Sequence, residues 1–103
     1  MAETKTEEPK SPIEEKVRLM FRQGGYAPAA ELLKAHLAEH QDDVPSYELL
    51  ADALRYSGDK RGAAAALSRA SELYAEAGQG IQSIAAQKRV MKLGVEPDFT
   101  IIR

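Results

Sequence analysis

The sequence contains no cysteine and no tryptophan, and only 6% of its residues are aromatic. The absence of cysteine excludes disulfides and thiolate metal sites. β-Branched residues are also scarce, whereas alanine and leucine dominate the apolar positions. This composition favours helices over sheets, so we expect an all-α fold.

Long apolar runs and an excess of basic charge are also missing. No run approaches the roughly eighteen apolar residues of a membrane span, and residues 1–10 carry Lys and Glu where a signal peptide needs an apolar core. Fourteen basic and sixteen acidic residues give a net charge of -2, whereas a nucleic-acid surface needs a basic excess. We expect a cytoplasmic protein without membrane insertion and without a nucleic-acid partner.

The chain divides into a tail, a helical domain and a short apolar end. Residues 1–11 are too polar to offset their ordering entropy by burial, so we expect a disordered N-terminal tail. Ser11 and Pro12 then have the side chains of an N-cap and a first helical residue. The helical domain is expected over residues 12–97, and residues 98–103 are expected to be an extended apolar C-terminal tail. The expected helices cover residues 12–23, 26–40, 44–57, 60–77 and 81–93.

Three kinds of residue recur with a period of thirty-four residues. The pairs are Gly24 and Gly58, Ala29 and Ala63, and Leu33 and Leu67. A turn glycine, a small residue and a large apolar residue at one fixed spacing indicate stacked repeats, in which neighbouring units share a core.

This pattern resembles the tetratricopeptide repeat. The matching positions are Ile13, Met20, Gly24, Tyr26, Ala29, Leu33 and Leu37 in the first unit, and Tyr47, Leu50, Ala51, Leu54, Gly58, Ala63, Leu67 and Ala70 in the second. Leu50-Ala51 stands where the family has a Leu-Gly pair. The resemblance implies antiparallel helical hairpins stacked as a short solenoid of about five helices.

The period changes after the second unit, because Gly78 follows Gly58 by twenty residues instead of thirty-four. We therefore expect the helix over residues 60–77 to belong to two units at once, giving two repeats and one closing helix. The segment from residue 73 to residue 93 is similar to the closing segment of tetratricopeptide-like modules attached to bacterial signalling and motility proteins.

The closing helix has one apolar side, and its outer side must be polar or covered. Ile81, Ile84, Ala85 and Met91 share a side, and polarity is expected from Gln82, Gln87, Lys88, Arg89 and Lys92. Phe99, Ile101 and Ile102 are expected to fold back as a lid, because small domains rarely expose such residues. The alternative is that these three residues dock into another chain.

The string His36-Leu37-Ala38-Glu39-His40 has the H-x-x-E-H form of the inverted zinc-peptidase motif. Two histidines four residues apart share a helix face and can hold zinc while a glutamate activates water. Such peptidases need a far larger chain and a third ligand from a neighbouring helix. We therefore expect no metal, no cofactor and no enzymatic activity.

The resemblance implies a protein-binding groove lined by the first helix of each unit. The matching candidate residues are Arg18, Phe21, Arg22, Glu48, Asp52, Arg55 and Tyr56. Arginines beside aromatic rings suit a peptide with acidic side chains and an apolar anchor. A solvated helix face with incidental ion pairs is the alternative for these residues.

The expected function is a non-enzymatic adaptor that binds a peptide or protein segment. The sequence has no asparagine, so the paired asparagines of the carboxylate clamp, which bind chaperone tails in some family members, are excluded. The alternative function is a self-assembling structural module, a homo-oligomer stacked through the closing helix or the C-terminal tail.

Overall fold

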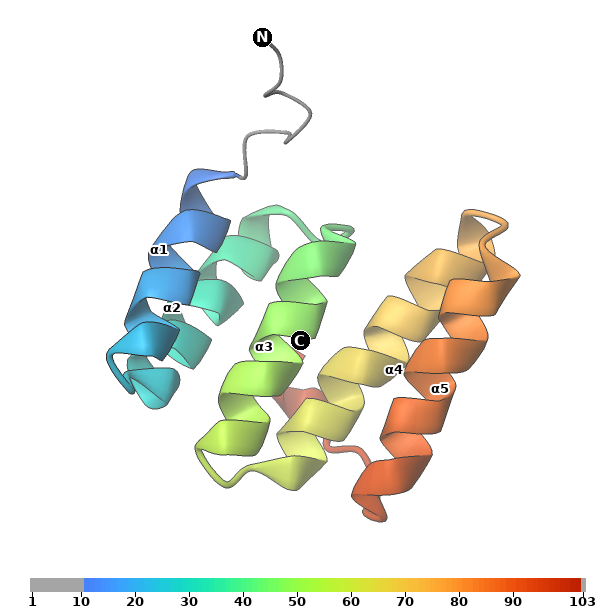
Figure 1. Cartoon of the computed structure of the whole chain (residues 1–103). Helices are drawn as coiled ribbons and strands as arrows, with labels where there is room; N and C mark the ends of the chain where they lie inside the picture. The colour runs from blue at the N-terminus through green and yellow to red at the C-terminus, as the bar shows by residue number, and fades with distance from the viewer. Residues whose placement is uncertain (1–10, 103) are drawn as a thin grey trace, which may run out of the picture.

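A computed structural model describes residues 11–102 of the chain, and it is all-α. No strand occurs in residues 11–102, and the expected tail over residues 1–11 lies outside them except for its last residue. The elements are α1 (Pro12–Arg22), α2 (Tyr26–Glu39), α3 (Val44–Tyr56), α4 (Lys60–Glu76), α5 (Gly80–Leu93) and a final 3-10 helix, η2 (Phe99–Ile102) (Figure 1). The prediction of an all-α fold is confirmed.

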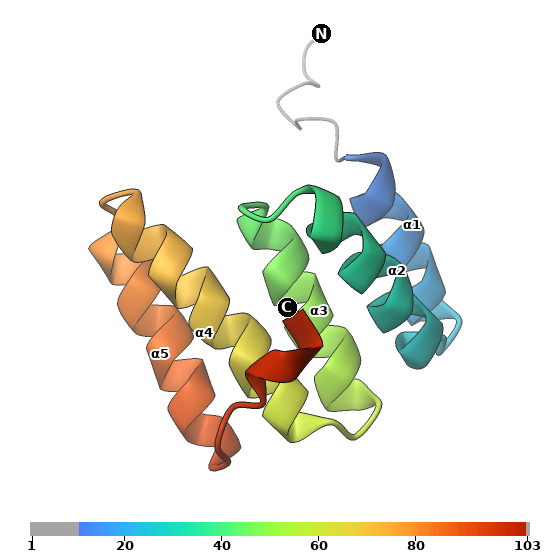
Figure 2. The ribbon, with the colours of Figure 1, turned by 180° about the vertical axis from the view of Figure 1, so that it is seen from behind.

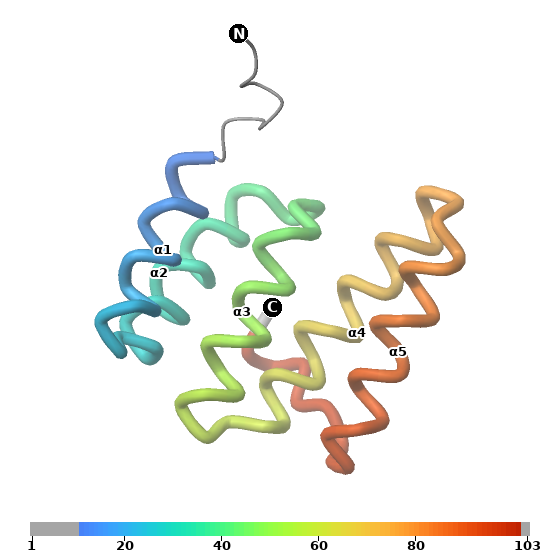
Figure 3. The backbone as a smooth tube through the Cα atoms, in the orientation of Figure 1, coloured from blue at the N-terminus to red at the C-terminus, as the bar shows by residue number. Residues whose placement is uncertain are grey.

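Consecutive helices run in opposite directions and pack against each other (Figures 1 and 3). Helices α1, α3 and α5 lie toward the viewer in Figure 1, and α2 and α4 lie behind them. The view from the other side shows η2 crossing this rear layer (Figure 2). Side chains from α1, α3 and α5 therefore make up one broad face of the molecule.

Helix α1 begins as the sequence predicts. The Ser11 hydroxyl oxygen accepts the Glu14 backbone N–H at 3.2 Å, and Pro12 occupies the first helical turn. This capping bond satisfies one of the backbone donors that a helix start leaves without a partner. On the inner side of α1, Val17 is fully buried.

The two glycines of the repeated motif adopt the same backbone geometry. Gly58 has a φ of 96°, and its N–H donates to the Arg55 carbonyl at 3.2 Å while the Asp59 N–H donates to the Leu54 carbonyl at 2.7 Å. At Gly24, with a φ of 77°, the equivalent bonds measure 3.0 and 2.8 Å. This is the Schellman arrangement, which requires a left-handed residue and so favours glycine.

Helix α4 is one uninterrupted helix of seventeen residues and packs against α3 and α5 together. The prediction that one helix spans this region is therefore confirmed. Residues 63–66 are four alanines, all fully buried, and such small side chains allow neighbouring helices to approach closely. A Cβ atom at Gly62 would lie 2.5 Å from Asp59 Oδ2 and 3.1 Å from Leu54 Cδ1, so close packing accounts for this glycine.

A buried polar cluster holds α5 against α4. Ser71 is buried, and its hydroxyl lies 2.9 Å from the Ser83 hydroxyl and accepts from Gln87 Nε2 at 3.0 Å. The Ser83 hydroxyl also donates to the Ser71 carbonyl at 3.0 Å. Hydrogen bonds at a helix contact favour one specific packing, so this cluster around the buried Ser71 favours the observed rotation of α5.

The outer side of α5 is polar only in part: Gln82, Lys88 and Lys92 are exposed as expected, but exposed apolar residues lie beside them. Ile81, Ile84 and Met91 do share a side, but that side is exposed, with 83%, 58% and 74% of each residue accessible. The side facing the core carries Ala86, Val90 and Leu93. Two of the expected outer polar residues bond to neighbouring helices: Gln87, which stays exposed, donates to Ser71, and Arg89 donates to Asp52. The hydrogen bonds to α3 and α4 thus favour an orientation of α5 in which its larger apolar side chains are exposed.

The C-terminal residues are not extended as expected, because Phe99–Ile102 form η2. The Asp98 carboxylate accepts the Thr100 N–H at 3.2 Å and its hydroxyl at 2.6 Å, which favours a turn. The expected lid over α5 is also wrong, since η2 packs on α4 and α2, where Ile101 joins the core (Figure 2). Phe99 stays exposed, and the Ile102 side chain lies outside the described residues.

The Gly58 turn can be tested by substitution. Gly58→Ala places a Cβ on a left-handed residue, so we expect the free energy of unfolding in urea to fall by about 1 kcal/mol. Gly80→Ala is the control, because Gly80 begins α5 without a positive φ and with open space around it. We expect this control to cause no loss. Equal losses in both variants would contradict the backbone explanation.

Deleting residues 99–103 tests the role of η2. Since Ile101 packs on the core of its own chain, we expect a lower melting temperature with an unchanged molecular mass by light scattering. Ile101→Ala is expected to cost about 1 kcal/mol or more, and the same change at the exposed Phe99 less. A change in mass at constant melting temperature would instead assign η2 to contacts between chains.

Candidate functional site

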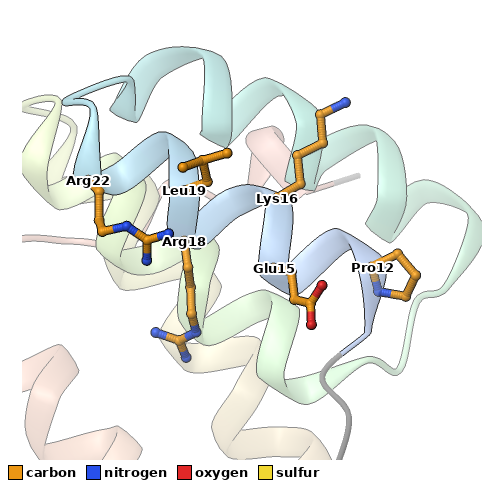
Figure 4. Close-up of a pocket in the computed structure, with 6 residues that line it drawn as sticks. All are labelled: Pro12, Glu15, Lys16, Arg18, Leu19 and Arg22. Carbon is orange, nitrogen blue, oxygen red and sulfur yellow. The ribbon is translucent and has the colours of Figure 1, made fainter.

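The two candidate arginines of α1 lie together on its solvent side. Arg18 and Arg22 are exposed and border a shallow hollow of about 630 Å³ lined by α1 residues (Figure 4). Arg18 also forms an ion pair with Glu14 one turn earlier, with Nη2 and Oε2 3.1 Å apart. Exposed pairs of this kind contribute little to stability, so Arg18 can exchange its partner easily.

Aromatic side chains connect α1 to α3. The Phe21 ring lies 5.5 Å from the Tyr26 ring, and Tyr26 lies 5.0 Å from Tyr56, measured between ring centroids. The Arg55 guanidinium sits 4.4 Å above the Tyr56 ring. These contacts bring three predicted residues, Phe21, Arg55 and Tyr56, into one continuous row. The 55% exposure of Tyr56 leaves part of that row open to a ligand.

An ion cluster joins α3 to α5. The Asp52 carboxylate lies 3.5 Å from Arg55 Nη2 and 3.1 Å from Arg89 Nη2. Two cations thus share one acid, so the local charge is positive even after pairing. The guanidinium groups are preorganised by their common partner, and each has further N–H donors for a second acceptor.

A hollow of about 350 Å³ lies beside this cluster, between α3 and α5. Arg55, Arg89 and Lys92 line it together with the apolar side chains of Leu67 and Leu93. Leu67 belongs to α4 and is almost completely buried, so it closes the floor. The hollow therefore offers an apolar floor surrounded by cations. We name it the α3–α5 hollow.

Glu48 does not join this positive site. Its carboxylate accepts a hydrogen bond from the Tyr74 hydroxyl at 2.8 Å. Burial, followed by the hydrogen bond to Glu48, raises the pKa of Tyr74 above its ordinary value, so the hydroxyl keeps its proton and the bond persists. Glu48 therefore ties α3 to α4.

The H-x-x-E-H string forms a different arrangement from a zinc site. His36 Nε2 lies 2.7 Å from Asp43 Oδ2, and the His36 and His40 rings stack with centroids 4.5 Å apart. Among residues 11–102, no group of three or more His, Cys, Asp or Glu side chains is placed to hold a metal ion. The contact ties the end of α2 to Asp43, the residue before α3.

The structure brings only part of the predicted site together. Arg55 lines the α3–α5 hollow and contacts Asp52 and Tyr56, and Phe21 is linked to Tyr56 through the aromatic row. Arg18 and Arg22 border a separate hollow. The sequence reasoning missed Tyr26, Leu67, Arg89, Lys92 and Leu93. Helix α4 packs on both α3 and α5, and the shortened glycine spacing that predicted this single helix was the signal that could have pointed to Arg89.

Comparison of the chain with protein-family models, with curated proteins and with solved structures gives no match. Within residues 11–102, no helix combines the length and the apolar character needed to cross a membrane.

The contact of Asp43 predicts a pH dependence of stability. Burial acts to raise the pKa of Asp43, but hydrogen bonds from His36 and Ser46 and the attraction of His36 outweigh it, so the pKa lies below its ordinary value. The ionised carboxylate therefore stabilises the fold above the ordinary pKa of about 4, and this contribution disappears as the pH falls through the lowered pKa.

We expect Asp43→Asn to lower the free energy of unfolding at pH 7 by about 1 kcal/mol, and less at pH 3. Urea unfolding of both proteins at the two pH values measures this difference. Asp42→Asn is the matched control, because Asp42 is exposed in the same turn. If the loss at pH 3 equals that at pH 7, ionised Asp43 does not stabilise the fold.

Proposed function

We propose that the chain is a non-enzymatic, tetratricopeptide-like adaptor module that binds a peptide segment of another protein. The ligand carries an apolar anchor side chain beside acidic side chains. The anchor enters the α3–α5 hollow, and the acids contact the cations around it. The single observation that carries the proposal is the combination of Arg55, Arg89 and Lys92 around the apolar Leu67 and Leu93.

The repeat supports the tetratricopeptide-like part of the proposal. The residue pairs at a spacing of thirty-four lie at corresponding places in two helical hairpins, and both turn glycines make the same pair of backbone hydrogen bonds. The paired small and large apolar residues Ala29, Ala63, Leu33 and Leu67 are all buried. A unit that buries the same positions in two successive hairpins fits a stacked repeat.

The shape and chemistry of the surface favour an extended peptide over a small molecule. The α3–α5 hollow is open and continues into the row of Arg55, Tyr56, Tyr26 and Phe21. An anchor side chain fills only the hollow, so adjoining residues of the ligand can stack along the row. Guanidinium groups bind carboxylates through paired hydrogen bonds, which gives such a surface its preference for acids.

The contacts of the two histidines support the non-enzymatic part of the proposal. His36 contacts the Asp43 carboxylate at 2.7 Å and stacks on His40, which gives both rings a packing role at the end of α2.

The binding proposal is tested with two short fluorescent peptides, one with a leucine between glutamates and one with a leucine between lysines. We expect fluorescence anisotropy to show binding of the glutamate peptide alone, weakening as salt screens the charges. Arg55→Glu should weaken this binding about tenfold or more, because it replaces an attraction by a repulsion.

Arg69→Glu is the matched control, since Arg69 pairs with Glu72 on α4 and does not line the α3–α5 hollow. Circular dichroism should show equal helicity in both variants. Equal affinity of the two peptides, or equal loss from the two substitutions, would remove the α3–α5 hollow as the binding site.

A further inference from the structure

The outer side of α5 carries exposed large apolar residues that the adaptor proposal leaves unused. Ile81, Ile84 and Met91 follow one another along it at helical spacing, and Ala85 lies exposed between them. We call these four residues the α5 stripe. Exposed large apolar residues in a row, in contrast to scattered ones, mark interaction sites.

The α5 stripe lies where a further helix would continue the stack. Among the described elements, α2, α3 and α4 each pack against the helices on both sides of them in the chain, whereas α5 packs against α4 alone. Its fourteen residues span about 21 Å, enough for several turns of a partner helix. Ridges of side chains three and four residues apart fit the grooves of another helix.

The charges around the stripe indicate what kind of helix fits. Lys88 and Lys92 are exposed beside Met91, and the three side chains border a shallow hollow of about 310 Å³. Helix α5 carries three basic residues and no Asp or Glu, and its third cation, Arg89, is already paired with Asp52. A partner with acidic side chains beside its apolar face would match this arrangement.

A second copy of α5 fits less well. Lys88 lies between Ile84 and Met91, near the middle of the stripe. In a symmetric antiparallel pair, residues near the middle approach their own counterparts, so the two Lys88 side chains would come together. Since α5 offers no acid to compensate, like charges would oppose each other across the contact.

We propose that the α5 stripe docks an amphipathic helix of another protein that carries acidic side chains along the edge of its apolar face. The isoleucines and Met91 pack on the apolar residues of that helix, and Lys88 pairs with one of its carboxylates. Methionine adapts its shape to a partner surface, which suits Met91 to such a contact. This surface is separate from the α3–α5 hollow except for Lys92, which borders both.

The test uses two synthetic amphipathic helices, one of leucine, alanine and glutamate and one with every glutamate replaced by lysine. We expect the glutamate helix to bind the full chain and the lysine helix to bind about tenfold more weakly or not at all. Ile84→Ser should weaken binding of the glutamate helix about tenfold, and Lys88→Glu should reverse the preference. Both positions are exposed, so circular dichroism should be unchanged.

Arg55→Glu separates this site from the α3–α5 hollow and should leave the glutamate helix bound. Loss of binding in Arg55→Glu, with retention in Ile84→Ser, would overturn the α5 proposal. Absence of binding, or equal binding of the two helices, would overturn it as well. A concentration-dependent dimer that Ile84→Ser abolishes would assign the stripe to a second copy. Sedimentation with phosphatidylserine vesicles that Ile84→Ser abolishes would assign it to a membrane surface.

Discussion

The architecture depends on the burial of α4 on several sides at once. Its four successive alanines, residues 63–66, are fully buried, and α3, α5 and η2 all pack against this one helix. Small side chains permit short distances between helix axes. Larger side chains of the neighbouring helices, such as Leu50 and Leu54 of α3, fill the core volume that the alanines leave. The close spacing that results lets single side chains reach from α3 to α5, as Arg89 does to Asp52.

Both proposed binding surfaces depend on which polar side chains of α5 bond to the neighbouring helices. Gln87 donates to Ser71 and Arg89 to Asp52, so these polar groups contribute to the helix packing. The α3–α5 hollow thereby gains a cation, while the outer side of α5 keeps its isoleucines exposed beside Lys88 and Lys92. One rotation of a helix about its axis thus determines the character of two faces of the molecule.

Local signals in the sequence predicted the helices well, because each boundary depends on a few adjacent residues. The left-handed glycines and the Ser11 cap define ends that need no tertiary contact. The single helix α4 was likewise predictable from the shortened spacing between Gly58 and Gly78. The rotation of α5 was not, since both of its sides show helical periodicity and the deciding partners, Ser71 and Asp52, lie on other helices. The path of η2 also depends on contacts with α2 and α4.

The return of η2 to α2 and α4 changes how the molecule can open. A stack in which each helix touches only its neighbours can fray from either end, one layer at a time. Here α5 is the last layer but not the end of the described chain, because the chain continues back to α4, where the Asp98 N–H donates to the Arg61 carbonyl at 3.0 Å. Detaching α5 at its C-terminal end therefore also loads the contacts that η2 makes with α4 and α2. Hydrogen exchange in the last turn of α5 should accordingly be slower than at a free helix end.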